Sequence, residues 1–96
     1  MVVFTCKDRF DDIMTCIYEA WASHLGHNNI KLRIEPLGTM ELFCEYRHVE
    51  ADREKTESVI RTIQQKISFR AYQMVYHAAM AADEEEKLDS IYRFLI

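Results

Sequence analysis

Glycine and proline are scarce in this chain, with two Gly and one Pro among 96 residues. Linkers and low-complexity segments are rich in such residues, so we expect neither. Long hydrophobic runs are also missing, and none approaches the roughly 20 apolar residues that a membrane-spanning helix needs. The N-terminus has no basic lead before its short apolar run, which excludes a standard signal peptide. The sequence therefore predicts one domain over residues 1–96, located in the cytoplasm and without a membrane partner.

Cysteine is sparse as well. Cys6, Cys16 and Cys44 are odd in number and far apart, which argues against a secreted disulfide framework and favours reduced, buried thiols. The tight three-cysteine motif of a radical-SAM iron–sulfur cluster is absent. Among the histidines, only His24 and His27 come close together, and we interpret them as caps of helix carbonyls. The sequence predicts no metal site and no cofactor.

Surplus positive charge is also absent, because the net charge is −4. A sequence-independent nucleic-acid binder needs extra Lys and Arg to displace counterions from phosphates, so the composition argues against that class. A local patch is the exception, and its members Lys31, Arg33 and Arg47 are the candidate nucleic-acid-binding residues. Sheets that bind single strands also present exposed aromatic side chains, and Phe43 is the one aromatic residue expected on that side.

Helical periodicity is what the chain does contain. Residues 10–25 place seven apolar side chains at spacings of three and four, the pattern of one long amphipathic helix. Asp8 is its expected N-cap, and Gly26 is its expected C-terminal stop. The stripe includes Trp21, the single Trp of the chain, and we expect other elements to cover it.

Three segments have the character of strands. Residues 30–34 alternate apolar and charged side chains, which is the period of a half-buried strand. Residues 2–6 are β-branched and aromatic, and residues 42–49 resume extended character after a break at Pro36. We expect residues 30–34 and 42–49 to form an antiparallel hairpin, and this hairpin to join residues 2–6 in one sheet.

From Asp52 onward the period is helical. Asp52, Ser68 and the pair Asp83 and Glu86 are the expected caps of three successive helices. The expected inward faces are Thr56, Val59, Ile60, Ile63 and Ile67, then Phe69, Tyr72, Val75, Tyr76 and Ala79, then Leu88, Ile91, Tyr92 and Leu95. The predicted fold class is α+β, a small and mostly antiparallel sheet of about three strands packed by four helices in the order β-α-β-β-α-α-α.

The last residues keep a helical pattern to the end of the chain. No glycine or polar turn closes the segment 91–96. We therefore expect the chain to be the N-terminal part of a longer protein. Phe94 and Ile96 are the expected contacts to that missing portion or to a partner, and we expect self-association through this apolar end in its absence.

Four blocks of sequence, in this order and spacing, resemble the N-terminal region of a bacterial family of predicted DNA metabolism or DNA repair proteins, a domain of unknown function. The blocks are residues 4–8, 18–29, 42–46 and 71–79, the last followed by 91–94. Genes of this family lie beside that of a radical-SAM protein, and some members are fused to a uracil-DNA-glycosylase-like domain. The similarity covers essentially the whole chain, although family members are much longer.

The resemblance implies a role in DNA metabolism or repair, as a non-catalytic accessory or scaffold module for a radical-SAM protein or a glycosylase-like domain. Two alternatives stay open. One is direct nucleic-acid binding through the three cations named above. The other is an enzyme whose site is completed by the missing portion, with His24, His27 or His48 contributing. No catalytic residue is assigned, because neither the family nor the sequence offers a consistent set.

Overall fold

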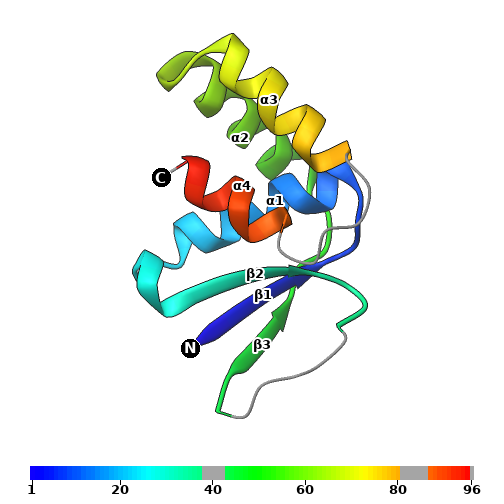
Figure 1. Ribbon diagram of the computed structural model, residues 1–96, viewed down its shortest axis with the longest axis vertical. Coiled ribbons are helices and arrows are strands. Elements are labelled where there is room, and N and C mark those ends of the chain that lie inside the picture. The colour runs from blue at the N-terminus through cyan, green and yellow to red at the C-terminus, as the bar shows by residue number, and fades with distance from the viewer. Residues whose placement is uncertain (38–42, 81–86, 96) are drawn as a thin grey trace.

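The predicted order of elements is confirmed by a computed structural model, which describes residues 1–37, 43–80 and 87–95 (Figure 1). Within these ranges the chain forms three strands, four α-helices and one short 3-10 turn. The elements are β1 (Val2–Cys6), α1 (Phe10–Ala22), η1 (His27–Asn29), β2 (Ile30–Ile34), β3 (Glu45–His48), α2 (Arg53–Lys66), α3 (Phe69–Met80) and α4 (Lys87–Leu95).

The sheet is parallel, so the predicted antiparallel hairpin is wrong. β1 lies in the centre of the order β2-β1-β3, and both outer strands run parallel to it. The helix α1 carries the chain from β1 back to the start of β2, as parallel neighbours require. The second and third strands do not pair with each other. The central position belongs to β1, the most apolar of the three strands, because it can be buried on both sides.

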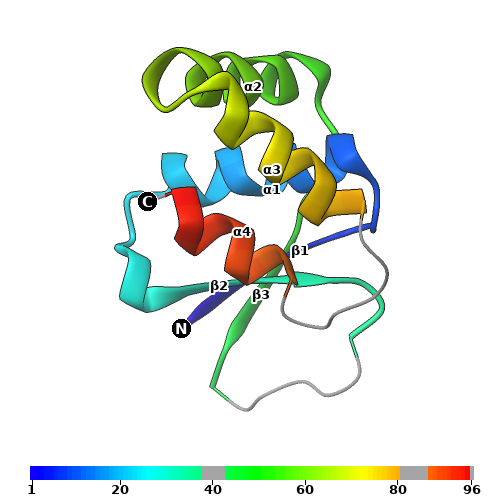
Figure 2. The same cartoon turned by 45° about the horizontal axis from the view of Figure 1, so that its top comes forward.

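All four helices of the described chain lie on one side of the sheet (Figures 1 and 2). α1 packs on β1 and β2, and α4 packs beside it on β2. α2 and α3 form an outer layer, with α2 on α1 and α3 on α2 and α4. The opposite face of the sheet, which we call the open face, is therefore not covered by any of these helices.

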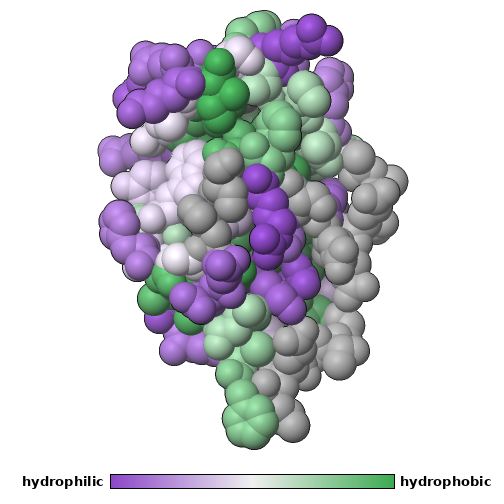
Figure 3. Space-filling view, turned by 60° about the vertical axis from the view of Figure 1, so that its left-hand side comes forward, coloured by the Kyte–Doolittle hydropathy of each residue, from purple (hydrophilic) through white to green (hydrophobic). Residues whose placement is uncertain are grey.

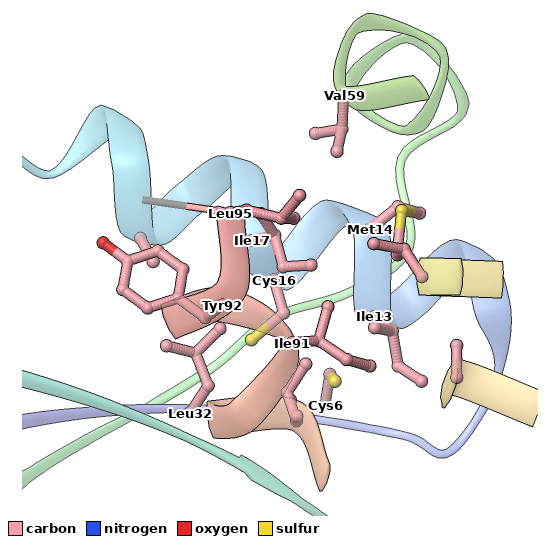
Figure 4. Packing of buried hydrophobic residues seen from close by; sticks show 14 of the residues in the cluster. Cys6, Ile13, Met14, Cys16, Ile17, Leu32, Val59, Ile91, Tyr92 and Leu95 are labelled. Atoms are coloured by element: carbon pink, nitrogen blue, oxygen red, sulfur yellow. The ribbon is translucent and has the colours of Figure 1, made fainter. Parts of the chain in front are cut away.

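The main core lies between the sheet and the layer of α1 and α4 (Figure 4). Cys6 and Leu32 project from the strands and are fully buried. They belong to one buried cluster with Ile13 and Ile17 of α1, which are also fully buried. The predicted inward face of the last helix is confirmed, since all of its members are buried: Leu88, Ile91, Tyr92 and Leu95.

The helix α1 is shorter than its sequence pattern predicts. It begins after Arg9, whose backbone is extended, and Asp8 does not cap it. It ends at Ala22, because His24 takes a left-handed conformation with φ of 54°. Gly26, with φ of 90°, instead opens the turn η1. Leu25 is consequently 37% exposed rather than part of the core stripe.

The other helix starts follow their predicted caps where the structure describes them. The Asp52 carboxylate accepts the Lys55 N–H at 3.0 Å, and the Ser68 hydroxyl accepts the Ala71 N–H at 2.9 Å. The expected cap at Asp83 and Glu86 lies outside the described residues. The third predicted strand, 42–49, is shorter in the structure: residue 42 lies outside the described residues, Phe43 has a positive φ of 64°, and the strand covers Glu45–His48.

Thr15 links α1 to the start of α2 through a buried group of hydroxyls. It donates to the Asp11 carbonyl at 2.8 Å and accepts the Asp52 N–H at 3.0 Å. Its oxygen is also 3.2 Å from the Thr56 hydroxyl. Both threonines are almost fully buried, so this network fixes where α2 begins relative to the core.

Among the residues described, no helix combines the length and the apolar character that crossing a membrane requires.

Candidate functional site

The open face of the sheet brings two of the three predicted cations together. In parallel strands, residues paired across the sheet project from the same face. The register therefore defines two rows on the open face, namely Lys31–Val3–Tyr46 and Arg33–Thr5–His48. Lys31 and Arg33 lie side by side along β2, and Tyr46 lies across β1 from them. The aromatic residue on this face is Tyr46, whereas the sequence suggested Phe43.

Arg47 does not belong to that group. It pairs in register with Phe4, whose ring lies in the main core, so its side chain leaves the sheet on the helix-covered side. The Arg47 guanidinium is 5.8 Å from the centroid of the Phe4 ring and forms an ion pair with Glu45. The structure thus places Lys31 and Arg33 on one face and Arg47 on the other.

A polar cluster forms where the three strands end, and we call it the strand-end cluster: Thr5, Glu35, His48 and Glu50. Glu35 follows β2 directly, His48 is the last residue of β3, and Thr5 lies near the end of β1. His48 bonds to Glu35 through Nδ1 and to Glu50 through Nε2, the latter at 2.7 Å. Thr5 donates its hydroxyl to the same Glu35 carboxylate at 2.7 Å. Side chains from both edges of the sheet therefore meet across β1.

Electrostatics favour the charged forms of the two central groups. Hydrogen bonds to Glu35 and Glu50 raise the pKa of His48 above its ordinary value. Burial acts to raise the pKa of Glu35, but hydrogen bonds from His48 and Thr5 outweigh it and leave that pKa lowered. The arrangement favours an imidazolium between two carboxylates.

A cleft of about 410 Å³ opens beside this cluster, between the end of β3, α1 and the start of α2. His48 and Glu50 line one wall, and Lys55 and Glu19 line another. Lys55 pairs with Glu19, and that hydrogen bond raises the lysine pKa. The carboxyl ends of parallel strands are where α/β proteins place ligand sites, which makes this cleft the natural polar site of the fold.

The remaining sequence candidates lie apart from the strand-end cluster. His24 is exposed beyond the end of α1, and the position of the His27 side chain is outside the described part. Cys6 and Cys16 are buried as predicted, and a hydrogen bond between them, together with burial, raises the Cys16 pKa. Cys44 is partly buried. The described residues contain no group of three His, Cys, Asp or Glu side chains that could hold a metal ion.

A second surface was not among the sites predicted from the sequence. We call it the aromatic surface: Phe10, Phe69, Tyr72, Tyr76 and Met80. The Phe10 ring is 5.2 Å from that of Tyr76 and 6.4 Å from that of Tyr72, and the Phe69 ring is 6.1 Å from Tyr72. These rings form a continuous series along α3 and the start of α1.

Three members of the aromatic surface face solvent, two of them where the sequence predicted core, while Phe10 and Tyr72 are partly buried against the core. Phe69 is 60% exposed, Tyr76 41% and Met80 61%, so the prediction that Phe69 and Tyr76 point inward is wrong. The buried stripe of α3 is instead made of Ala71, Val75 and Ala79. In Figure 3, hydrophobic side chains lie at the centre and right of the upper part of the molecule, which is the layer of α2 and α3, with hydrophilic side chains around them.

The signal for this surface is present in the sequence. Phe69, Tyr72, Tyr76 and Met80 follow one another at spacings of three, four and four, beside the separate stripe at 71, 75 and 79. The apolar arc of α3 is therefore wider than one neighbouring layer can cover. The excess width, rather than any single residue, indicates a second contact.

At the apolar end of α4, the structure describes Phe94 but not Ile96. Phe94 is 51% exposed while its neighbour Leu95 is buried. Ile96, the other predicted contact to a partner or C-terminal portion, lies outside the described residues.

No protein-family model matches the chain, and neither does any curated protein or solved structure. The class that fold and surfaces define is an α+β domain with a three-stranded parallel sheet, helices on one face, a polar site at the strand ends and an apolar surface on its outermost layer.

Proposed function

We propose that this chain is a cytoplasmic accessory module of a DNA metabolism or repair protein, and that it binds a radical-SAM protein or a glycosylase-like domain. The observation that carries the proposal is the exposure of the aromatic surface. Aromatic and methionine side chains are enriched in the centres of protein interfaces. The resemblance of the sequence to a DNA-repair family supplies the class of partner.

The physical reason is the cost of leaving this surface in water. Contiguous exposed apolar patches are uncommon on monomeric proteins unless they bind something. Phe69 and Met80 lie near the two ends of α3, and the rings of Tyr72 and Tyr76 lie between them. A partner helix laid along α3 would cover all four, in the manner of a helix seated in a hydrophobic groove. Phe94 on α4 is a further exposed apolar side chain for the same partner.

The test is co-expression of the full chain with a radical-SAM protein, and separately with a uracil-DNA-glycosylase-like domain. We expect one of the two to co-purify with the wild type and to be lost with Met80→Glu. Gln65→Glu is the matched control, because it adds the same charge at an exposed position of α2. Failure of both partners to bind, or equal binding by both variants, would contradict the proposal.

Direct binding of single-stranded nucleic acid is a second candidate, favoured by the open face. Lys31, Arg33 and Tyr46 combine cations with an aromatic ring on one sheet surface, which is how sheets hold single strands. Arg47 gives the control, because it carries the same charge on the opposite face.

We expect Arg33→Glu to weaken binding of a single-stranded oligonucleotide and to reduce the slope of log affinity against log salt by about 0.7. Arg47→Glu should leave that slope unchanged. A fluorescence-anisotropy titration across a salt series measures both. Equal effects of the two substitutions would assign the binding to net charge and remove the open face as a site.

A further inference from the structure

We infer that Glu35, His48 and Glu50 form a proton-dependent clasp that fastens the two outer strands to each other across β1. Glu35 belongs to the end of β2, and His48 belongs to the end of β3. Their side chains bond directly, although β2 and β3 share no backbone ladder. Glu50 adds the segment that leads into α2, through its 2.7 Å contact with His48 Nε2.

The clasp depends on protonation because of how many hydrogens the imidazole carries. Both ring nitrogens face carboxylate oxygens, and an ionised carboxylate accepts hydrogen bonds but cannot donate them. An imidazolium donates from both nitrogens and satisfies both carboxylates. A neutral imidazole donates from one, so its other nitrogen presents a lone pair to a negative oxygen. Loss of one proton therefore converts one of the two bonds into a repulsion.

The surroundings of His48 include charged groups from several elements. Lys7, between β1 and α1, acts on Glu35 and lowers the pKa of that carboxyl group. The neighbouring cleft adds Glu19 of α1, Arg47 of β3, and Asp52 and Lys55 at the start of α2. Lys55 is paired with Glu19, and Arg47 is paired with Glu45. The two carboxylates that bond to His48 are thus the dominant influence on its charge.

This geometry fits a clasp better than a catalytic base. A general base must present one free ring nitrogen to its substrate. Here both nitrogens of His48 are engaged by the protein itself, and 41% of its side chain remains exposed for exchange of protons with water. The inference concerns how the fold responds to pH and does not depend on the proposed partner.

The pH range of the closed clasp follows from the two pKa shifts. The pKa of His48 is raised from 6.5, so its contribution is complete below pH 6.5 and is lost as pH rises through the raised value. The pKa of Glu35 is lowered from 4.5, so its contribution is complete above pH 4.5 and is lost as pH falls through the lowered value. The clasp therefore contributes its full stability between pH 4.5 and 6.5, and it opens as pH rises through the raised pKa of His48.

Hydrogen exchange of single backbone amides tests this directly in the full chain. The Val49 N–H bonds to the Thr5 carbonyl at 2.7 Å, and the Glu35 N–H bonds to the Cys6 carbonyl at 2.8 Å, so both close the sheet beside the clasp. The Glu45 N–H bonds to the Met1 carbonyl at 3.0 Å at the other end of β3 and serves as the internal control.

We expect protection of the Val49 and Glu35 amides, after correction for intrinsic exchange, to fall severalfold in one titration centred above pH 6.5. Protection of Glu45 should not follow that titration. In His48→Gln the step should vanish, and in Glu50→Gln its midpoint should move to lower pH, because one stabilising carboxylate is gone. The inference would be overturned if protection of the Val49 amide did not change with pH, or if His48→Gln showed the same step. Both substitutions are at exposed positions, and the second keeps the histidine, so the test does not depend on one variant folding.

Discussion

The aromatic surface and the open face of the sheet differ in chemistry. The first exposes apolar side chains to water, and the second presents polar side chains that are already hydrogen-bonded. On the open face, Glu35 and His48 are satisfied by each other and by neighbouring polar groups. On the aromatic surface, Phe69 and Met80 are more than half exposed, and contact of these apolar side chains with water is unfavourable. Covering the second surface gains free energy, whereas covering the first must replace bonds that already exist. We therefore expect protein recognition at α3 and electrostatic regulation at the strand ends.

The largest effect should separate buried from exposed apolar side chains. Ile17 is fully buried, and Ile17→Ala should lower the free energy of unfolding by about 2–5 kcal/mol. Met80→Ala, which removes a side chain that is 61% exposed, should change it by no more than about 0.5 kcal/mol. Urea denaturation of both variants measures this difference. A loss of similar size in Met80→Ala would mean that the aromatic surface serves folding rather than binding.

A smaller effect should separate the buried polar bonds between α1 and α2 from those at the strand ends. Thr15→Val leaves the Asp52 N–H without its acceptor in the core, at a cost of about 1–3 kcal/mol, although the Thr56 hydroxyl keeps its bond to the Asp11 carbonyl. Thr5→Val removes one bond to Glu35, which keeps His48, so about 0.5–1.5 kcal/mol is expected. Thermal and urea unfolding of the two variants side by side compares them. The reverse ranking would show that the strand ends, not the contact of α1 with α2, hold the fold.

The smallest effect should be the pH dependence of stability. Because the pKa of His48 is raised in the folded state, its contribution is present below pH 6.5 and is lost above the raised value. The wild type should therefore be more stable than His48→Gln at pH 5.5 and should lose that advantage by pH 9. Urea unfolding at the two pH values measures the difference. An advantage that is constant with pH would indicate packing rather than charge.

The periodicity of apolar residues in the sequence predicted most of the local structure. The alternation of apolar and charged side chains over β2 correctly separates buried Ile30 and Leu32 from Lys31 and Arg33. Asp52 and Ser68 cap the helices that they were expected to cap. These features depend on neighbours in sequence, and a single sequence contains that information.

Long-range features could not be read in the same way. Strand direction depends on how the chain returns between strands, so the parallel pairing of β3 with β1 has no local signal. That pairing decides the face of Arg47 and brings His48 to Glu35, 13 positions away in sequence. The end of α1 was misplaced because His24, not Gly26, adopts the left-handed conformation that closes the helix.

The most direct test of a division between the two surfaces is one binding experiment with two probes. Wild type, Met80→Glu and Arg33→Glu would each be titrated with the co-purifying protein partner and with a single-stranded oligonucleotide. We expect Met80→Glu to weaken the protein complex by about 30-fold or more, as loss of an interface hot spot does, while Arg33→Glu leaves it intact. Oligonucleotide binding should respond only to Arg33→Glu. Loss of the protein complex in Arg33→Glu, with Met80→Glu unaffected, would place recognition on the open face and contradict the division.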